Sequence, residues 1–92
     1  MTNSHIPRPG SYRGRLKAKQ ENRCCYCDLP LTWRGHQNPR RATIEHLRRR
    51  ADGGGNELDN LALACRECNE RRGTMNWLLY KSMKRGELRE FS

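Results

Sequence analysis

Two segments of this chain carry the pattern of β-strands, and a glycine-rich loop lies between them. The first segment, 40–47, contains the β-favouring pair Thr43–Ile44, and the second, 58–64, holds three leucines. Residues 51–57 include three consecutive glycines, which interrupt both patterns. We therefore expect two strands joined by a flexible loop.

Helices are expected on both sides of these strands. Ser11 is placed to cap a helix that runs to about Asn22, although Gly14 and a basic first turn disfavour it. A second helix is expected to begin at Cys65 and to end near Gly73.

A third helix is expected from about residue 74 to residue 85, with Thr74 as its N-cap. Four apolar residues recur there at helical spacing, and we expect them to face the core: Met75, Leu78, Leu79 and Met83. The chain then divides into a flexible basic arm (1–10), one folded domain (11–85) and a tail (86–92).

The composition limits how such a domain can be stabilised. Only 34% of the 92 residues are hydrophobic, and domains of this size usually add a metal ion or disulfides to a thin core. No apolar run is long enough to cross a membrane, and residues 1–7 lack the order of a secretory signal. We therefore expect a cytoplasmic protein with no membrane partner and with reduced cysteines.

The charge indicates a polyanionic partner. Nineteen Lys and Arg against ten Asp and Glu give a formal charge of +9, and fifteen of the nineteen are Arg, which forms forked hydrogen bonds with phosphate. A basic surface that is merely solvated would have the same composition. Both interpretations also apply to the cations in and beside the first expected helix, which are Arg13, Arg15, Lys17, Lys19 and Arg23.

Two Cys-x-x-Cys pairs, Cys24/Cys27 and Cys65/Cys68, are separated by 37 residues (28 through 64). The fifth cysteine, Cys25, is left over because only Cys24 and Cys27 have the spacing of the second pair. Four thiolates complete the tetrahedral shell of Zn²⁺ and leave no open position, so this zinc would be structural. Disulfides or a thioredoxin-like redox pair are the alternatives, but no βαβ pattern surrounds the first pair.

Candidates for catalysis lie beside these elements. His46 lies near the end of the first strand segment, and imidazole is the side chain that most often serves as a general base. Glu45 and Asn69 offer oxygen ligands of the kind that Mg²⁺ or Mn²⁺ accepts. A Glu–His pair alone is more often a solvated pair than an active site, so these residues indicate catalysis only in combination.

In combination, these residues resemble the HNH endonucleases of the ββα-metal (His-Me finger) superfamily. The resemblance covers about Leu16 to Gly73 and rests on Thr43-Ile44-Glu45-His46, Gly53-Gly54, Asn60-Leu61 and Cys65-x-x-Cys68-Asn69-x-x-Arg72-Gly73, with a Cys-x-Tyr-Cys knuckle at 24–27. It implies a small α+β, treble-clef-like fold. In that fold a two-stranded antiparallel hairpin packs on a helix (40–73), with flanking helices and a structural zinc held by four cysteines.

The resemblance also implies a role for each residue. His46 would be the general base that activates water, Glu45 and Asn69 would bind a catalytic Mg²⁺ or Mn²⁺, and Asn60 would brace the loop and orient His46. Asn69 stands where His is commoner in the family, and Glu45 where Asp is commoner. Strict strand alternation would point Glu45 and His46 to opposite faces, so the strand end must twist toward the helix if both are to serve.

The implied activity is metal-dependent hydrolysis of DNA, nicking or cutting a duplex with little sequence preference. Small phage or prophage members of the family imply a bacterial or phage-infected cell and a role beside packaging or restriction machinery. Five arginines are expected to hold phosphates near the cut: Arg48, Arg49, Arg50, Arg71 and Arg72. The alternative is a non-catalytic zinc module that binds nucleic acid or a protein partner.

Overall fold

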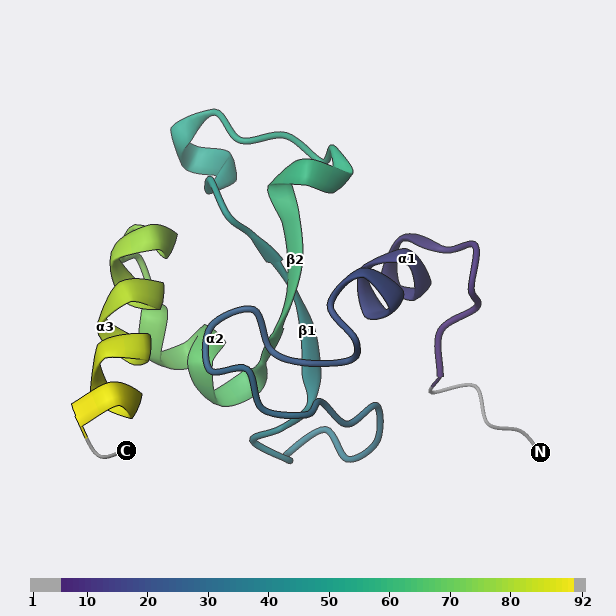
Figure 1. Cartoon of the computed structure of the whole chain (residues 1–92). Coiled ribbons are helices and arrows are strands. Elements are labelled where there is room, and N and C mark those ends of the chain that lie inside the picture. The colour runs from purple at the N-terminus through teal and green to yellow at the C-terminus, as the bar shows by residue number, and fades with distance from the viewer. Residues whose placement is uncertain (1–5, 91–92) are drawn as a thin grey trace.

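A computed structural model, which describes residues 6–90, places an antiparallel hairpin between helices (Figure 1). The elements in order are α1 (Tyr12–Lys19), β1 (Ala42–His46), β2 (Leu61–Cys65), α2 (Arg66–Arg72) and α3 (Trp77–Glu90), with 3₁₀ turns at Arg50–Asp52 and Leu58–Asn60. In Figure 1, α1 lies to one side of the hairpin and α2 and α3 to the other. The expected α+β fold, with a two-stranded hairpin packed on helices, is confirmed.

The hairpin is shorter than the two strand patterns indicate. Its strands pair from Ala42 opposite Cys65 to His46 opposite Leu61, and the start of the second segment forms a 3₁₀ turn instead. β2 is buried along its whole length, whereas β1 is buried only in part. The outer edge of β2 is covered by the side-chain amide of Gln20, which exchanges two hydrogen bonds with the backbone of Leu63.

α1 begins where the sequence predicts and ends earlier. The Ser11 hydroxyl accepts a hydrogen bond from the N–H of Gly14 at 3.1 Å, which is the expected N-cap. The helix ends at Lys19 rather than near residue 22, because Glu21 and Asn22 adopt left-handed backbone angles that turn the chain back toward the knuckle.

α3 contacts the domain through a different face from the one that its apolar spacing indicates. Leu78, Leu79 and Met83 are 55%, 55% and 51% exposed, so the prediction that they form core is wrong. Among residues 77–86, the buried one is Tyr80, whose ring contacts that of Tyr26 edge-on with the centroids 5.0 Å apart. Because this aromatic contact sets the rotation of the helix about its axis, the three aliphatic side chains turn outward.

The ends of α3 also differ from expectation. Asn76, rather than Thr74, caps the helix, since its Oδ1 accepts hydrogen bonds from the N–H groups of Leu78 and Leu79. The helix continues to Glu90, so most of the predicted tail is helical, while residues 91–92 and the first five residues of the predicted arm lie outside the described part. Within residues 6–90 no helix is both long and apolar enough to span a membrane.

Among the described residues the core is small, and cysteine is as common in it as leucine. Besides four buried cysteines and two small residues of the hairpin, it contains seven larger side chains: Leu16, Tyr26, Leu31, Trp33, Leu61, Leu63 and Tyr80. Such a core agrees with the low hydrophobic fraction of the sequence, and it makes the geometry of the cysteines important for stability.

Gly14 provides a test of how residues 6–10 lie on α1. A Cβ at Gly14 would stand 1.9 Å from the carbonyl oxygen of Arg8, whereas a Cβ at Gly10 would meet no atom within 4 Å. Gly14→Ala should therefore lower the free energy of unfolding by about 1–3 kcal/mol, although alanine favours helix. Gly10→Ala should change it by less than about 0.5 kcal/mol. Urea denaturation measures both, and equal stabilities would contradict this packing.

Candidate functional site

Four cysteine sulfurs meet at the centre of the domain. The Sγ atoms of Cys24, Cys27, Cys65 and Cys68 all lie within 4.8 Å of one another, the four residues are buried, and Cys25 is outside the group. Zn–S bonds of about 2.3 Å in a tetrahedron put sulfurs about 3.8 Å apart, and those of Cys27 and Cys65 are 3.9 Å apart. These four residues, the cysteine cage, could therefore hold a zinc ion.

Hydrogen-bond donors surround the cage. The backbone N–H of Tyr26 donates to Cys24 Sγ at 3.3 Å, and Nη2 of Arg40 donates to Cys27 Sγ at 3.1 Å. The contact with Cys24 acts to raise the pKa of Cys27, but contacts with the second cysteine pair outweigh it and lower this pKa to about 6. Hydrogen bonds from these donors favour thiolate, the form of cysteine that binds metal.

The cage holds α2 against β1 along a seam made by Thr43 and Glu45 on the strand and by Asn69 and Arg72 on the helix. Nδ2 of Asn69 donates to Oγ1 of Thr43 at 3.0 Å, and Nη1 of Arg72 donates to Oε2 of Glu45 at 3.1 Å. Alternate strand residues share a face, and helix residues three apart share a face. The Glu45 carboxylate and the Asn69 amide therefore occupy adjoining positions along the seam.

Glu45 is a buried carboxylate that two donors hold by one oxygen. Besides Arg72, the hydroxyl of Tyr26 donates to Oε2 at 3.0 Å. Burial raises the pKa of Tyr26 and the negative charge of Glu45 raises it further, so the phenol keeps its proton and donates it. The two hydrogen bonds fix the direction of the Glu45 carboxylate, as a metal ligand requires.

Arg72 joins the strand end to both neighbouring segments. Its side chain is only 3% exposed. In addition to its bond with Glu45, it donates to the Tyr26 hydroxyl and to the backbone carbonyl oxygens of His46, Leu47 and Met75. A guanidinium that is so nearly enclosed offers almost no surface to a phosphate, so we do not propose Arg72 as a phosphate contact.

The imidazole of His46 is partly exposed and points to the hairpin loop. Its Nε2 lies 2.8 Å from Oδ1 of Asn56. An amide oxygen only accepts, so Nε2 donates its hydrogen in this contact, which in the neutral ring leaves a lone pair on Nδ1. No hydrogen bond within residues 6–90 joins this ring to Glu45 or Asn69.

Asn60 ties the two ends of the hairpin loop together. Its Oδ1 accepts from the N–H of Arg48 at 2.8 Å, and its Nδ2 donates to the carbonyl oxygens of Arg48 and Gly55. Gly55 directly precedes Asn56. Asn60 therefore has no direct contact of its own with the imidazole of His46 among these bonds. It holds the loop next to Asn56, whose side chain hydrogen-bonds that imidazole.

The three arginines after His46 have different surroundings. Arg49 forms an ion pair with Asp52, and its hydrogen bond holds the pKa of that carboxyl below its usual value. Nε of Arg48 donates to the carbonyl oxygen of Asp52. Arg50 is exposed, and no bond from its side chain is found within the described residues. All three border the loop that positions His46.

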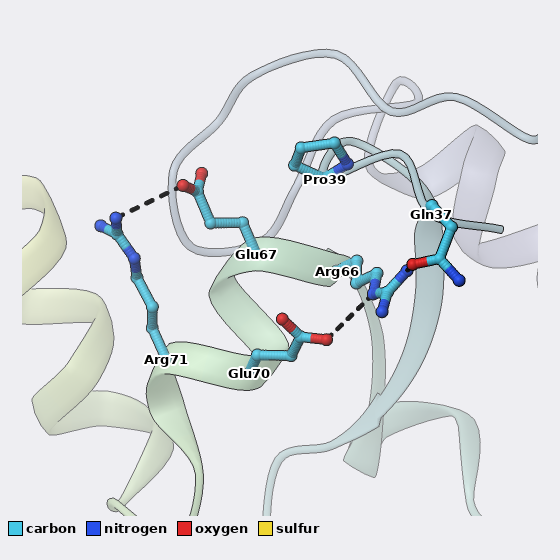
Figure 2. A pocket seen from close by; sticks show the side chains of 6 residues that line it. All are labelled: Gln37, Pro39, Arg66, Glu67, Glu70 and Arg71. Atoms are coloured by element: carbon cyan, nitrogen blue, oxygen red, sulfur yellow. Dashed lines mark hydrogen bonds and ion pairs between the residues drawn. The ribbon is translucent and has the colours of Figure 1, made fainter. Parts of the chain in front are cut away.

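The outer face of α2 carries neutralised charges. Arg71 pairs with Glu67 at 3.4 Å, and Arg66 pairs with Glu70 at 2.9 Å; both pairs line the hollow drawn in Figure 2. Each of these cations already has an acidic partner. Arg71, which the sequence suggests as a phosphate ligand, thus lies where carboxylates would repel a phosphate.

Two residues of the site carry no clear signal in the sequence. Tyr26 belongs to the knuckle motif, but nothing in that motif indicates that its hydroxyl reaches the strand carboxylate. Asn56 lies in a glycine-rich loop whose pattern indicates only flexibility. Both contacts depend on how the loop and the knuckle fold over the hairpin.

The Glu45–Arg72 pair should show strong coupling in stability. Removing the cation in Arg72→Met leaves a buried carboxylate without its partner and should cost about 3–5 kcal/mol. The double variant Glu45→Gln/Arg72→Met should be more stable than the sum of the two single variants predicts, because neither charge is then orphaned. Urea denaturation of all four proteins measures the coupling, and simple additivity would contradict a buried ion pair.

Comparison with known proteins identifies a family for this chain. No curated protein and no solved structure matches the chain. The family described as HNH endonuclease matches residues 24–74, the segment that contains the whole cysteine cage, the hairpin and the seam. This segment is more than half of the chain, and we conclude that the protein belongs to the HNH endonuclease family.

Proposed function

We propose that the protein is a divalent-metal-dependent endonuclease that hydrolyses phosphodiester bonds of duplex DNA with low sequence specificity. Family membership supports nuclease chemistry on DNA. The observation that carries the finer proposal is the seam, where Glu45 and His46 end a strand packed beside the helix that bears Asn69.

His46 is proposed as the general base. Its Nδ1 accepts a proton from the attacking water, since Nε2 already carries the hydrogen directed at Asn56. The same hydrogen bond fixes the ring plane and strengthens when the ring becomes positively charged. Arg72 contributes by holding the His46 backbone carbonyl, which keeps the strand end in place while the side chain reacts.

Glu45 and Asn69 are proposed to hold Mg²⁺ or Mn²⁺. Oε2 of Glu45 and Nδ2 of Asn69 are engaged in the seam, which leaves Oε1 of Glu45 and Oδ1 of Asn69 as the proposed ligand atoms. A carboxylate and an amide oxygen are the hard donors that these ions prefer. When bound, such an ion stabilises the charge that develops on the phosphate and on the leaving oxygen.

Low sequence specificity follows from the chemistry of the cations near the site. Arg48 and Arg50 are proposed to contact phosphates beside the cut, whereas Arg49 is paired with Asp52. Phosphate contacts fix position without reading bases. Three further predictions rest on the resemblance. They are a preference for duplex DNA, a location in the bacterial or phage-infected cytoplasm, and a link to packaging or restriction machinery.

The cysteine cage is proposed to hold one structural Zn²⁺. Its four thiols match the zinc shell in number and spacing, and a full shell leaves no position for substrate. The two proposed metals then have separate tasks. Zinc would stabilise the fold, and the hard cation would serve the reaction.

His46→Ala should reduce nicking of supercoiled plasmid in Mg²⁺ or Mn²⁺ by about 100-fold or more, because a positioned general base contributes about 10²–10⁴ in rate. Asn69→Ala should remain folded and raise the Mn²⁺ concentration needed for half-maximal rate. Gel separation of supercoiled, nicked and linear forms measures the rates.

Ser82→Ala is the control for the nicking assay, because Ser82 is exposed on α3 and lies outside the seam. It should keep the wild-type rate. The enzyme proposal fails if the wild-type protein and His46→Ala bind DNA equally and neither nicks it in any divalent ion, a result that would instead indicate a binding module.

Cys68→Ser should abolish zinc binding and cooperative folding, since metal binding and folding are coupled in such small domains. Cys25→Ser is the matched control, because that thiol lies outside the cage, and it should retain both. Elemental analysis should find one zinc per chain in the wild-type protein and in Cys25→Ser. A zinc-free Cys68→Ser protein with a wild-type thermal melt would refute the structural role.

A further inference from the structure

A groove leads from the seam along β1 toward α1. It consists of two adjoining cavities of about 450 and 620 Å³. The first is lined by Asn69 and Thr43 of the seam, and the second by Arg8 and residues near the start of α1. Arg13 and Arg41 line both cavities, so these two cations stand where the halves of the groove meet.

Arg41 has an unused donor in this groove. Its Nη1 is buried and finds no hydrogen-bond partner within the described residues. A buried donor without an acceptor is unfavourable, and most such groups in folded proteins are satisfied. An anionic oxygen in the groove would supply the missing acceptor, and a phosphate suits a guanidinium because it can accept two parallel bonds.

The charge of the groove is uncompensated, unlike that of the outer face of α2. Among its lining residues the one carboxylate is Glu70, which already pairs with Arg66. Neither Arg13 nor Arg41 forms an ion pair within residues 6–90. The neighbouring hollow of Figure 2 is instead lined by two closed ion pairs. A polyanion would therefore be attracted to the groove and not to the hollow.

We propose that this arginine groove binds the sugar–phosphate backbone of the substrate strand, on the side of the cut that runs from Asn69 toward α1, with Arg41 and Arg13 contacting successive phosphates. The proposal rests on the proposed function, because it uses Asn69 to mark the cleavage position. It adds two contacts that the sequence alone does not separate from the other basic residues. Arg15 is on the same helix as Arg13, yet it lines neither cavity.

The test is the salt dependence of binding to a fluorescently labelled 16-base-pair duplex, measured by anisotropy without added divalent ions or chelator. Arg13→Gln and Arg41→Gln should each weaken binding about 5- to 10-fold and lower the slope of log K against log salt by about 1. The matched controls Arg15→Gln and Arg34→Gln remove the same charge from exposed positions outside the groove. Each should leave the slope unchanged.

Two comparisons test whether a loss of DNA affinity has another cause, such as misfolding. Arg41→Lys should recover most of the slope, because it keeps the charge, and Arg13→Gln alters an exposed helix residue that should not affect folding. Equal losses in all four glutamine variants would overturn the proposal in favour of a general charge effect, as would unchanged slopes in the groove variants or no DNA binding by the wild-type protein. The plasmid assay reports separately on catalysis. If the wild-type protein nicks DNA but the groove variants keep the wild-type slope of log K against log salt, the groove proposal fails and the proposed function stands.

Discussion

The cysteine cage is the constraint on which the rest of the structure depends. Its four cysteines come from the knuckle before the hairpin, from the last residue of β2 and from the first turn of α2. α2 has seven residues, far fewer than an isolated helix needs for stability in water. The cage therefore decides where this helix lies, and the helix in turn brings Asn69 and Arg72 to the strand that carries Glu45 and His46.

The seam shows how a thin domain can keep a carboxylate buried beside solvent. Arg72 supplies the opposite charge and Tyr26 supplies a neutral donor, both to the same oxygen of Glu45. The cost of burying the charge is thus offset without occupying the other oxygen. Arg72 also fixes the backbone at His46, so the proposed base and the proposed metal ligand depend on the same guanidinium.

Local sequence patterns predicted the helices and strands well, but they did not predict the contacts between these elements. The strands, the Ser11 cap and the cysteine spacing each depend on residues close together in sequence, and the structure contains them. The apolar spacing of α3 predicted that one face of the helix is apolar, but not whether that face packs on the core. The packing of Tyr80 on Tyr26 determines which face does so.

The candidate site shows the same division. Glu45, His46 and Asn69 could be named because they stand beside recognisable strand and cysteine signals. The hydrogen-bond partners of these residues could not be named from the sequence. Asn56, for example, reaches His46 only because the loop folds back and Asn60 holds its two ends together. Arg72 was expected at a phosphate because it lies in a basic run, and only the packing of α2 on β1 shows that its guanidinium is buried.

The central claim is that the seam, and not the cage, takes up a second, exchangeable cation. Titrating Mn²⁺ into the ¹⁵N-labelled, zinc-loaded protein tests it most directly, because this paramagnetic ion broadens the amide signals nearest to it. The account predicts that the signals of Glu45, His46 and Asn69 broaden first, that Mg²⁺ competes, and that bound zinc is not displaced. Broadening centred elsewhere, or none at these three residues, would contradict it.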